Sequence, residues 1–261
     1  MPILVPHRVL VAPSGFKESL SSTEVAEAVA AGVRRVLPGA VIDSLPVVDG
    51  GEGTAADLAA ATGGRIVTRM VTGPVGEPVT AHFAMLGGAR SDTAVVEMAA
   101  AAGLRLVPHE HRDPTRTTTF GVGELLVAAL DEGAQRVIIG CGDSGTSDGG
   151  AGLVQAIGGR LLDHEGRDLP LGGAALSELA RVELSAVDPR LAATRIDVAC
   201  NGTHSLDDVD LLGAHVLEDD VEFGLLFFFG GGGGGAGGGG NGHRCGGAHA
   251  PGFFENLDQF S

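Results

Sequence analysis

The sequence contains no tryptophan and no tyrosine, and only 3 of its 261 residues are cysteine. It therefore lacks the commonest aromatic anchors of sugar-stacking sites and of strongly binding interfaces. Cys141, Cys200 and Cys245 are odd in number and form no CxxC pair, so their spacing predicts neither a disulfide framework nor a zinc site. We expect the thiols to be reduced.

Basic residues are also scarce, with 17 Lys and Arg against 33 Asp and Glu and a formal net charge of -16. This balance argues against a nucleic-acid partner, because phosphate backbones are neutralised by Lys and Arg. No run approaches the roughly 20 apolar residues of a membrane helix, and residues 1–13 lack the pattern of an export signal. These absences favour a cytoplasmic enzyme that acts on a small metabolite, without a membrane or nucleic-acid partner. The oligomeric state stays open.

Strands and helices alternate along the first 200 residues. Short β-branched runs predict strands over 7–12, 42–48, 137–139 and 196–200. Helical spacing predicts helices from Ser21, where Glu24 completes a capping box, to Leu37, and over 54–61, 121–130 and 150–157. Gly121 with Glu124 is expected to cap the third of these helices. This alternation predicts an α/β fold with a Rossmann-like, largely parallel sheet.

Two segments depart from that alternation. Residues 65–98 consist of short β-rich runs separated by Gly turns, which predicts a meander or mixed sheet in a second α/β subdomain inserted around 65–120. Residues 201–261 have a different composition, and Gly230 to Gly240 contains only Ala236 besides glycine. We expect 1–200 to form the α/β region and 201–261 to be a divergent, disordered tail, which leaves the C-terminal part of the fold incomplete.

The segment 137–152, VIIGCGDSGTSDGGAG, places a Gly-rich polar loop directly after a buried strand. Glycines let the backbone approach an anion, hydroxyls donate to phosphate, and carboxylates can bind a divalent cation. Asp143 and Asp148 are candidate Mg²⁺ ligands, although Asp148 is equally suited to cap the next helix. The candidate phosphate- or substrate-binding residues of this loop are Gly142, Ser144, Gly145, Thr146, Ser147, Gly149 and Gly150.

A second acid-glycine turn, DGGEGT at 49–54, opens the second helix. Asp49 and Glu52 are candidate catalytic residues, with the alternative that they only complement the helix dipole. Gly50 and Gly51 are candidate binding residues.

Lys17 lies in the turn after the first strand, in a chain with few lysines. It is a candidate clamp for phosphate or carboxylate, with a solvated surface lysine as the alternative. Ser14 in the same turn, Arg116, Thr118 and Thr119 complete the candidate binding residues.

Four motifs in order resemble the bacterial glycerate kinase family of type I, the glycerate 2-kinase-like group. They are PSGFKESL at 13–20, DGGEGT at 49–54, TTTFGVGEL at 117–125 and the 137–152 loop, supported by VTGP at 71–74, VEMAA at 96–100 and VACN at 198–201. The resemblance covers residues 8 to about 200. Members of that family continue past this point with a Phe-Gly-Pro-Gln-Lys-Gly-like motif, which does not follow Asn201 here.

The resemblance implies a kinase that transfers the γ-phosphoryl group of ATP, with Mg²⁺, to D-glycerate, giving phosphoglycerate and ADP. It also implies a Rossmann-like domain paired with a second α/β domain. The alternative is a non-catalytic nucleotide- or substrate-binding remnant of such a kinase. The loops contain neither a GxGxxG fingerprint after the first strand nor a Walker A motif, which argues against a nicotinamide-dependent dehydrogenase and a P-loop enzyme. Whether the 2- or the 3-hydroxyl is phosphorylated stays open.

Overall fold

The computed structural model describes residues 6–16, 19–47 and 50–199. The expected tail over 201–261 therefore lies outside the described residues. Among the helices of the described ranges, none is long and apolar enough to cross a membrane.

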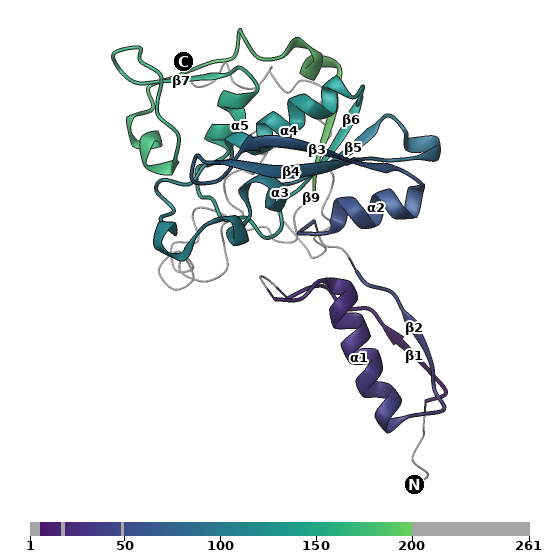
Figure 1. Cartoon of the computed structure of the whole chain (residues 1–261). Helices are drawn as coiled ribbons and strands as arrows, with labels where there is room; N and C mark the ends of the chain where they lie inside the picture. Colours follow the sequence, from purple (N-terminus) through teal and green to yellow (C-terminus); the bar gives the residue numbers. More distant parts are fainter. Residues whose placement is uncertain (1–5, 17–18, 48–49, 200–261) are drawn as a thin grey trace, which may run out of the picture.

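The first described elements form a small unit, here called the N-terminal unit, over residues 6–16 and 19–47. Strand β1 (Arg8–Val11) pairs in parallel with β2 (Val41–Ser44), and helix α1 (Ser22–Val36) connects and covers them. The predicted capping box is confirmed, because Ser21 Oγ accepts the N–H of Glu24 and the Glu24 carboxylate accepts the N–H of Ser21. In Figure 1 this unit lies beside the larger body.

The larger body is built on one five-stranded sheet of order β3-β4-β5-β6-β9. Strands β3 (Arg65–Thr72), β4 (Pro78–Met85) and β5 (Thr93–Glu97) are antiparallel neighbours, whereas β5, β6 (Arg136–Gly140) and β9 (Arg195–Ala199) run parallel. The α/β class with parallel strands is thus confirmed. The segment expected to form an insert supplies β3, β4 and β5 to this same sheet, and the division into domains stays a prediction.

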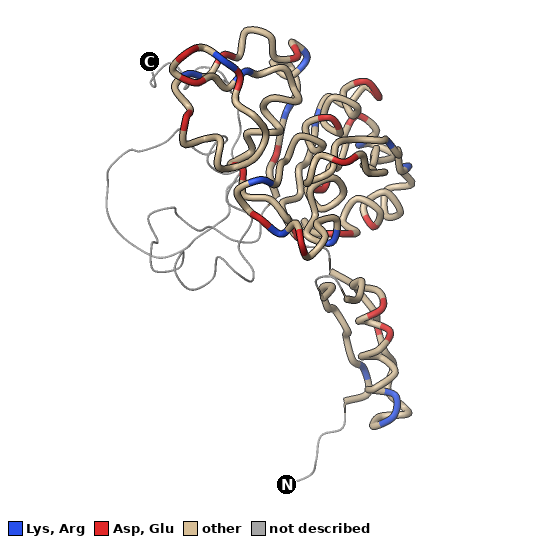
Figure 2. Tube along the Cα trace, turned by 60° about the vertical axis from the view of Figure 1, so that its left-hand side comes forward, with Lys and Arg blue, Asp and Glu red and all other residues tan. Residues whose placement is uncertain are grey.

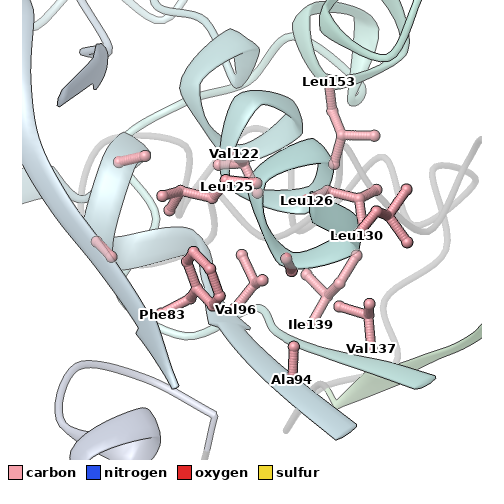
Figure 3. Close-up of a cluster of buried hydrophobic side chains, with 14 of the residues drawn as sticks. Phe83, Ala94, Val96, Val122, Leu125, Leu126, Leu130, Val137, Ile139 and Leu153 are labelled. Carbon is pink, nitrogen blue, oxygen red and sulfur yellow. The ribbon is translucent and has the colours of Figure 1, made fainter. Parts of the chain in front are cut away.

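Helices cover both faces of the sheet (Figure 1). Helix α4 (Phe120–Asp131) packs on one face together with α3 (Met98–Ala102) and α5 (Ala151–Ala156), and α2 (Thr54–Thr62) packs on the other. Alternate strand residues explain the two layers, since Val96 belongs to the α4 core and Val95 to the α2 core. Figure 3 shows the larger core, in which the α4 side chains face Phe83, Val96 and Ile139.

The remaining elements are short. Strands β7 (Arg160–Leu162) and β8 (Arg181–Glu183) form an antiparallel pair whose Leu161 packs with α5. Short 3₁₀ helices make up the rest of the described elements: Gly88–Arg90, Leu104–Leu106, His109–His111, Gly173–Glu178 and Pro189–Ala193.

Two local predictions need correction. Strand β2 ends at Ser44 rather than running to Val48, although the N–H of Leu45 still donates to the oxygen of Val11, the last residue of β1, at 2.8 Å, and that of Val47 to the oxygen of Pro13 at 2.9 Å. Glu124 does not cap α4, because its carboxylate accepts the N–H of Thr72 at 2.6 Å and Thr119 makes no side-chain cap bond. For Glu124, a partner distant in sequence decided the outcome.

Candidate active site

Three parallel strands end at the same level of the sheet. The last residues of β5, β6 and β9, namely Glu97, Gly140 and Ala199, are paired in register. In open α/β sheets ligands bind outside the carboxyl ends of the strands, because the loops that follow them converge there. This edge is the candidate site, and it receives the turn 50–55, the segment after β5 and the loop 141–150.

Two glycine turns pack backbone against backbone at this edge. A Cβ on Gly140 would lie 2.4 Å from the Gly50 carbonyl oxygen, and one on Gly142 would lie 2.4 Å from the Cα of Gly51. The N–H of Gly142 donates to the Gly50 oxygen at 3.1 Å, and Gly50 has a φ of +92°. Side chains at these positions would force the turns apart, so glycine here is required for close packing. The sequence motifs at 49–54 and 137–152 therefore form one structure.

Asp143 joins the two turns through its side chain. Its Oδ2 accepts the N–H of Glu52 at 3.1 Å, and its backbone has a φ of +59°, unusual for a residue with a side chain. The Glu52 carboxylate in turn pairs with Arg105 at 2.5 Å, both side chains being partly exposed. This pair places a carboxylate and a guanidinium at the rim of the edge. The charge of Arg105, after the larger effect of burial, also lowers the pKa of His82 on β4.

The hydroxyls of the 141–150 loop differ in accessibility. Ser144 and Thr146 are buried and their hydroxyl oxygens lie 3.1 Å apart, whereas Ser147 is exposed. Gly145 donates its N–H to the Ala102 oxygen at 2.8 Å, which fixes the loop against the segment after β5. Of the three predicted hydroxyl donors, Ser147 is the one that faces solvent.

Asp148 is the centre of a buried hydrogen-bond network. Its carboxylate accepts the N–H of Thr119 at 2.8 Å, of Gly150 at 3.1 Å and of Gly152 at 3.0 Å. The Thr119 and Thr118 hydroxyls donate to it as well, at 2.9 and 3.3 Å, and Asp148 is only 1% exposed. The network caps the start of α5 and joins it to the turn before α4. Because both carboxylate oxygens already accept hydrogen bonds from these donors, Asp148 is poorly suited to act as a metal ligand.

Glu97 is a buried carboxyl at the centre of the edge. Its side chain is fully buried, and its Oε1 accepts the N–H of Ala55 at 2.5 Å, in the first turn of α2. Its Oε2 is buried without a hydrogen-bond partner. Burial raises the pKa of Glu97 to about 7, against the lowering effect of the N–H groups of Ala55 and Gly53. A carboxyl in this state can hold or release a proton near neutral pH.

Comparisons with known proteins agree with this geometry. The sequence profile described as Glycerate kinase family matches residues 9–207. The chain belongs to the glycerate kinase family. A protein of Bacillus subtilis (strain 168) named "Glycerate kinase" is 56% identical over 194 residues, and one of Escherichia coli (strain K12) named "Glycerate 2-kinase" is 48% identical over 199 residues.

The chain spans about half the length of these relatives. The matches cover 74% and 76% of this chain but only 50% and 52% of the two proteins. A solved structure from Salmonella typhimurium LT2, 48% identical, aligns with a TM-score of 0.61 and likewise covers 76% of this chain and 53% of that one. The glycerate kinase fold is thus represented here in part.

The predicted site residues fall into four groups. The structure brings together Glu52, Gly50, Gly51, Gly142 and Asp143 at the edge, and it places Thr118, Thr119 and Gly150 around Asp148. Ser14 and Arg116 are exposed, Ser14 on the N-terminal unit and Arg116 in the turn before Thr117. Lys17 and Asp49 lie outside the described residues, so their roles stay predictions.

Sequence reasoning missed Glu97, Arg105 and His82 as members of this edge. Glu97 had a usable signal, because it is a lone acid at the end of an apolar strand, TAVVE, and acids are almost never buried without a partner. Arg105 and His82 had none, since they come near Glu52 only through folding.

Proposed function

We propose that this chain carries one wall of a kinase site that phosphorylates D-glycerate with ATP. The observation that supports it is the interlocked packing of the turn at Gly50 and Gly51 on the loop at Gly140 to Gly142, at the carboxyl ends of β5, β6 and β9. Such an arrangement offers backbone N–H groups and hydroxyls to an anionic ligand. Membership of the glycerate kinase family and the names of the relatives favour ATP and D-glycerate as that ligand pair.

The roles follow from accessibility and charge. The loop residues 142–150, with Ser147 as the exposed hydroxyl, bind phosphate or glycerate oxygens. Lys17 supplies positive charge at the transferred phosphate, and Asp49 or Glu52 receives the proton of the acceptor hydroxyl. The exposed Arg116, like Ser14, is a candidate for the carboxylate of glycerate.

Mg²⁺ would be held by the partly exposed carboxylate of Asp143 at the rim rather than by Asp148. Asp143 fits the preference of Mg²⁺ for one or two carboxylates and retained waters. No group of three or more potential metal ligands occurs among the described residues. The ion, when bound, would neutralise charge on the phosphates.

The setting we propose is cytoplasmic, with a small-molecule substrate and without a nucleic-acid partner. The formal charge of -16 supports the absence of a nucleic-acid partner, since the chain offers few basic side chains for phosphate backbones.

The experiment is a coupled ADP-release assay with ATP, Mg²⁺ and D-glycerate on the purified chain and on Lys17→Ala. We expect the substitution to lower kcat/KM by about 100-fold or more, as for loss of a charge that stabilises the transition state. Arg90→Ala is the matched control, because Arg90 is an exposed cation between β4 and β5, at the amino end of β5. Equal loss in both variants would remove Lys17 from the mechanism.

A second candidate is a protein that binds nucleotide without turning it over, favoured by the half-length match to the relatives. Calorimetric titration with ATP separates the two. Binding of ATP with no ADP release in the presence of D-glycerate would support this second candidate over the first.

A further inference from the structure

Glu97 supplies a cap that helix α2 lacks in its own sequence. Gly53, at the N-cap position of α2, has no side chain and a φ of +97°. The Glu97 carboxyl at the end of β5 accepts the N–H groups of Ala55 and Gly53 instead. The first N–H groups of a helix need such acceptors, and a Ser, Thr, Asp or Asn at the N-cap position usually provides one. Here the start of α2 is fixed to the end of a strand.

Residues 50–55, here called the α2 turn, carry Glu52 and are held by side chains from other segments. The N–H of Glu52 donates to Asp143 Oδ2 at 3.1 Å, and the Glu52 carboxylate pairs with Arg105. Both of these contacts lie at the exposed rim, whereas the contact of Glu97 with the turn is buried. Glu97 is therefore the buried anchor of the turn that places Glu52 at the candidate site.

The second oxygen of Glu97 determines which form of the carboxyl fits this packing. Oε2 is buried without a hydrogen-bond partner, in a residue that is 0% exposed. A negative charge on such an oxygen is costly, whereas a proton on Oε2 removes the charge and leaves Oε1 able to accept N–H groups. Burial accordingly raises the pKa of Glu97 to about 7. The protonated carboxyl is the form that fits the packed turn.

Several charged groups surround Glu97. On the described elements next to it they are Glu52 and Asp57 of the α2 turn and α2, His82 of β4, Arg105 after α3, and Asp143 after β6. Glu52 raises the pKa of Glu97 and Arg105 lowers it. Burial, and then the charge of Arg105, lowers the pKa of His82, so this side chain is neutral where Glu97 titrates. Ionisation of Glu97 therefore adds a second negative charge near that of Glu52.

We propose that Glu97 is a positioning residue, which holds Glu52 at the site while its carboxyl is protonated and releases the α2 turn when the proton passes to solvent. The ionised Oε2 has no donor, and its charge adds to that of Glu52. Both costs fall when the turn moves and water reaches the carboxylate. The effect on turnover rests on the proposed function, whereas the movement of the turn does not.

Hydrogen exchange of the full chain, read by mass spectrometry between about pH 5.5 and 8.5, tests the movement of the turn. In wild type we expect exchange of residues 52–57, corrected for the intrinsic rate, to rise at least about 10-fold through pH 7. In Glu97→Gln it should stay level, because glutamine keeps the acceptor and cannot ionise.

The start of α1 is the internal control. Figure 2 shows acidic positions along α1, which include Glu24 of its first turn. The N–H and hydroxyl of Ser21 lower the pKa of Glu24, so this cap stays ionised over the whole range. Corrected exchange at the start of α1 should therefore not change with pH.

Two substitutions separate positioning of Glu52 from simple capping of α2. Glu52→Gln should lower the pH midpoint of the exchange transition, and Arg105→Gln should raise it, because their charges act on Glu97 in opposite directions. The same midpoint in wild type and both variants would overturn the proposal. Wild-type exchange that is independent of pH would overturn it as well, and so would an equal rise in Glu97→Gln.

The coupled ADP-release assay measures the effect on turnover. The ratio of wild-type kcat to that of Glu97→Gln should fall about 10-fold between about pH 6 and pH 8, with the KM for ATP unchanged within about 2-fold. Taking the ratio removes the titration of ATP and of groups that both proteins share. Glu24→Gln is the matched control, because it changes an exposed capping acid on α1, and it should follow the wild-type pH profile.

The two arms fail in distinguishable ways. A constant kcat ratio in an active protein would overturn the role of Glu97 in placing Glu52 for turnover. Wild type that releases no ADP, but shows the expected exchange transition and midpoint shifts, would refute the proposed function and still support the hold of Glu97 on the α2 turn.

Discussion

Glu97 combines burial with ionisable chemistry at the point where the candidate site is assembled. Its ordinary pKa of 4.5 is raised to about 7 by desolvation, against the opposing effects of the N–H groups of Ala55 and Gly53. Glu52 raises it further and Arg105 lowers it, so both charged neighbours of the rim influence this carboxyl. The protonation state of Glu97 therefore depends on the turn that carries Glu52, Gly53 and Ala55.

The stability of the fold should depend on pH through Glu97. Because its pKa in the folded state is raised above its unfolded value, its stabilising contribution is complete below about pH 4.5 and is lost as pH rises through about 7. The loss amounts to about 3 kcal/mol. Glu97→Gln keeps the acceptor for Ala55 and cannot ionise, so its stability relative to wild type should rise by that order between pH 4.5 and 8.

Urea unfolding of both proteins at several pH values measures this difference. The Glu52→Gln variant is the control, since Glu52 is partly exposed and its loss should leave most of the pH dependence in place. Unfolding free energies of wild type and Glu97→Gln that run parallel with pH would contradict the prediction.

Asp148 should matter for stability more than any other acid of its loop. Asp148→Ala leaves the N–H groups of Thr119, Gly150 and Gly152 without their acceptor in a buried site. Each unsatisfied buried donor costs about 1 to 3 kcal/mol, so with three such donors we expect a loss of at least about 3 kcal/mol by chemical denaturation. Ser147→Ala next to it should change stability by less than about 0.5 kcal/mol, because Ser147 is exposed. Equal effects would mean that the network contributes little.

At the scale of elements, the two glycine turns depend on each other. Gly142→Ala would place a Cβ 2.4 Å from the Cα of Gly51, a backbone atom that cannot rotate away. We expect destabilisation of about 1 to 3 kcal/mol from this overpacking, with a lower melting temperature. Gly32→Ala in α1 is the matched control, because nothing lies within 4 Å of its added Cβ and alanine favours a helix by about 1 kcal/mol. A tolerated Gly142→Ala would show that the turns can separate without cost.

The helix ends show how far local sequence rules reach. The start of α1 was predictable because Ser21 and Glu24 satisfy each other's backbone N–H groups within four residues. The start of α4 was located, but its capping was predicted wrongly. Glu124 accepts the N–H of Thr72 instead, on a strand 52 residues earlier. A carboxylate is bound by the best-placed donor, and only the folded chain determines which donor that is.

At the scale of the whole molecule, the two parts should differ in local stability. All five residues of β5 are buried, and α4 packs its apolar side chains into the core in Figure 3, whereas the N-terminal unit exposes most of its large apolar residues. Few buried contacts mean low-energy local opening. We expect the amides of β1, α1 and β2 to exchange roughly 100-fold or more faster than those of β5 and α4.

Native-state hydrogen exchange read by mass spectrometry measures this contrast. The β7–β8 pair, which is short but packs Leu161 against α5, should fall between the two. Equal protection of the N-terminal unit and the central strands would contradict the prediction.

The sequence by itself determined the α/β class, the cap of α1, the glycine turns and the family, because these depend on local periodicity, on capping within one turn and on motifs that stand in order. Only the tertiary structure decided that β3 and β4 extend the sheet of β5, that Asp148 accepts hydrogen bonds from buried N–H groups, and that the charges of Glu52 and Arg105 act on the pKa of Glu97. Burial and long-range hydrogen bonds set the roles of these acids, and both arise when segments distant in sequence converge at the carboxyl ends of the parallel strands.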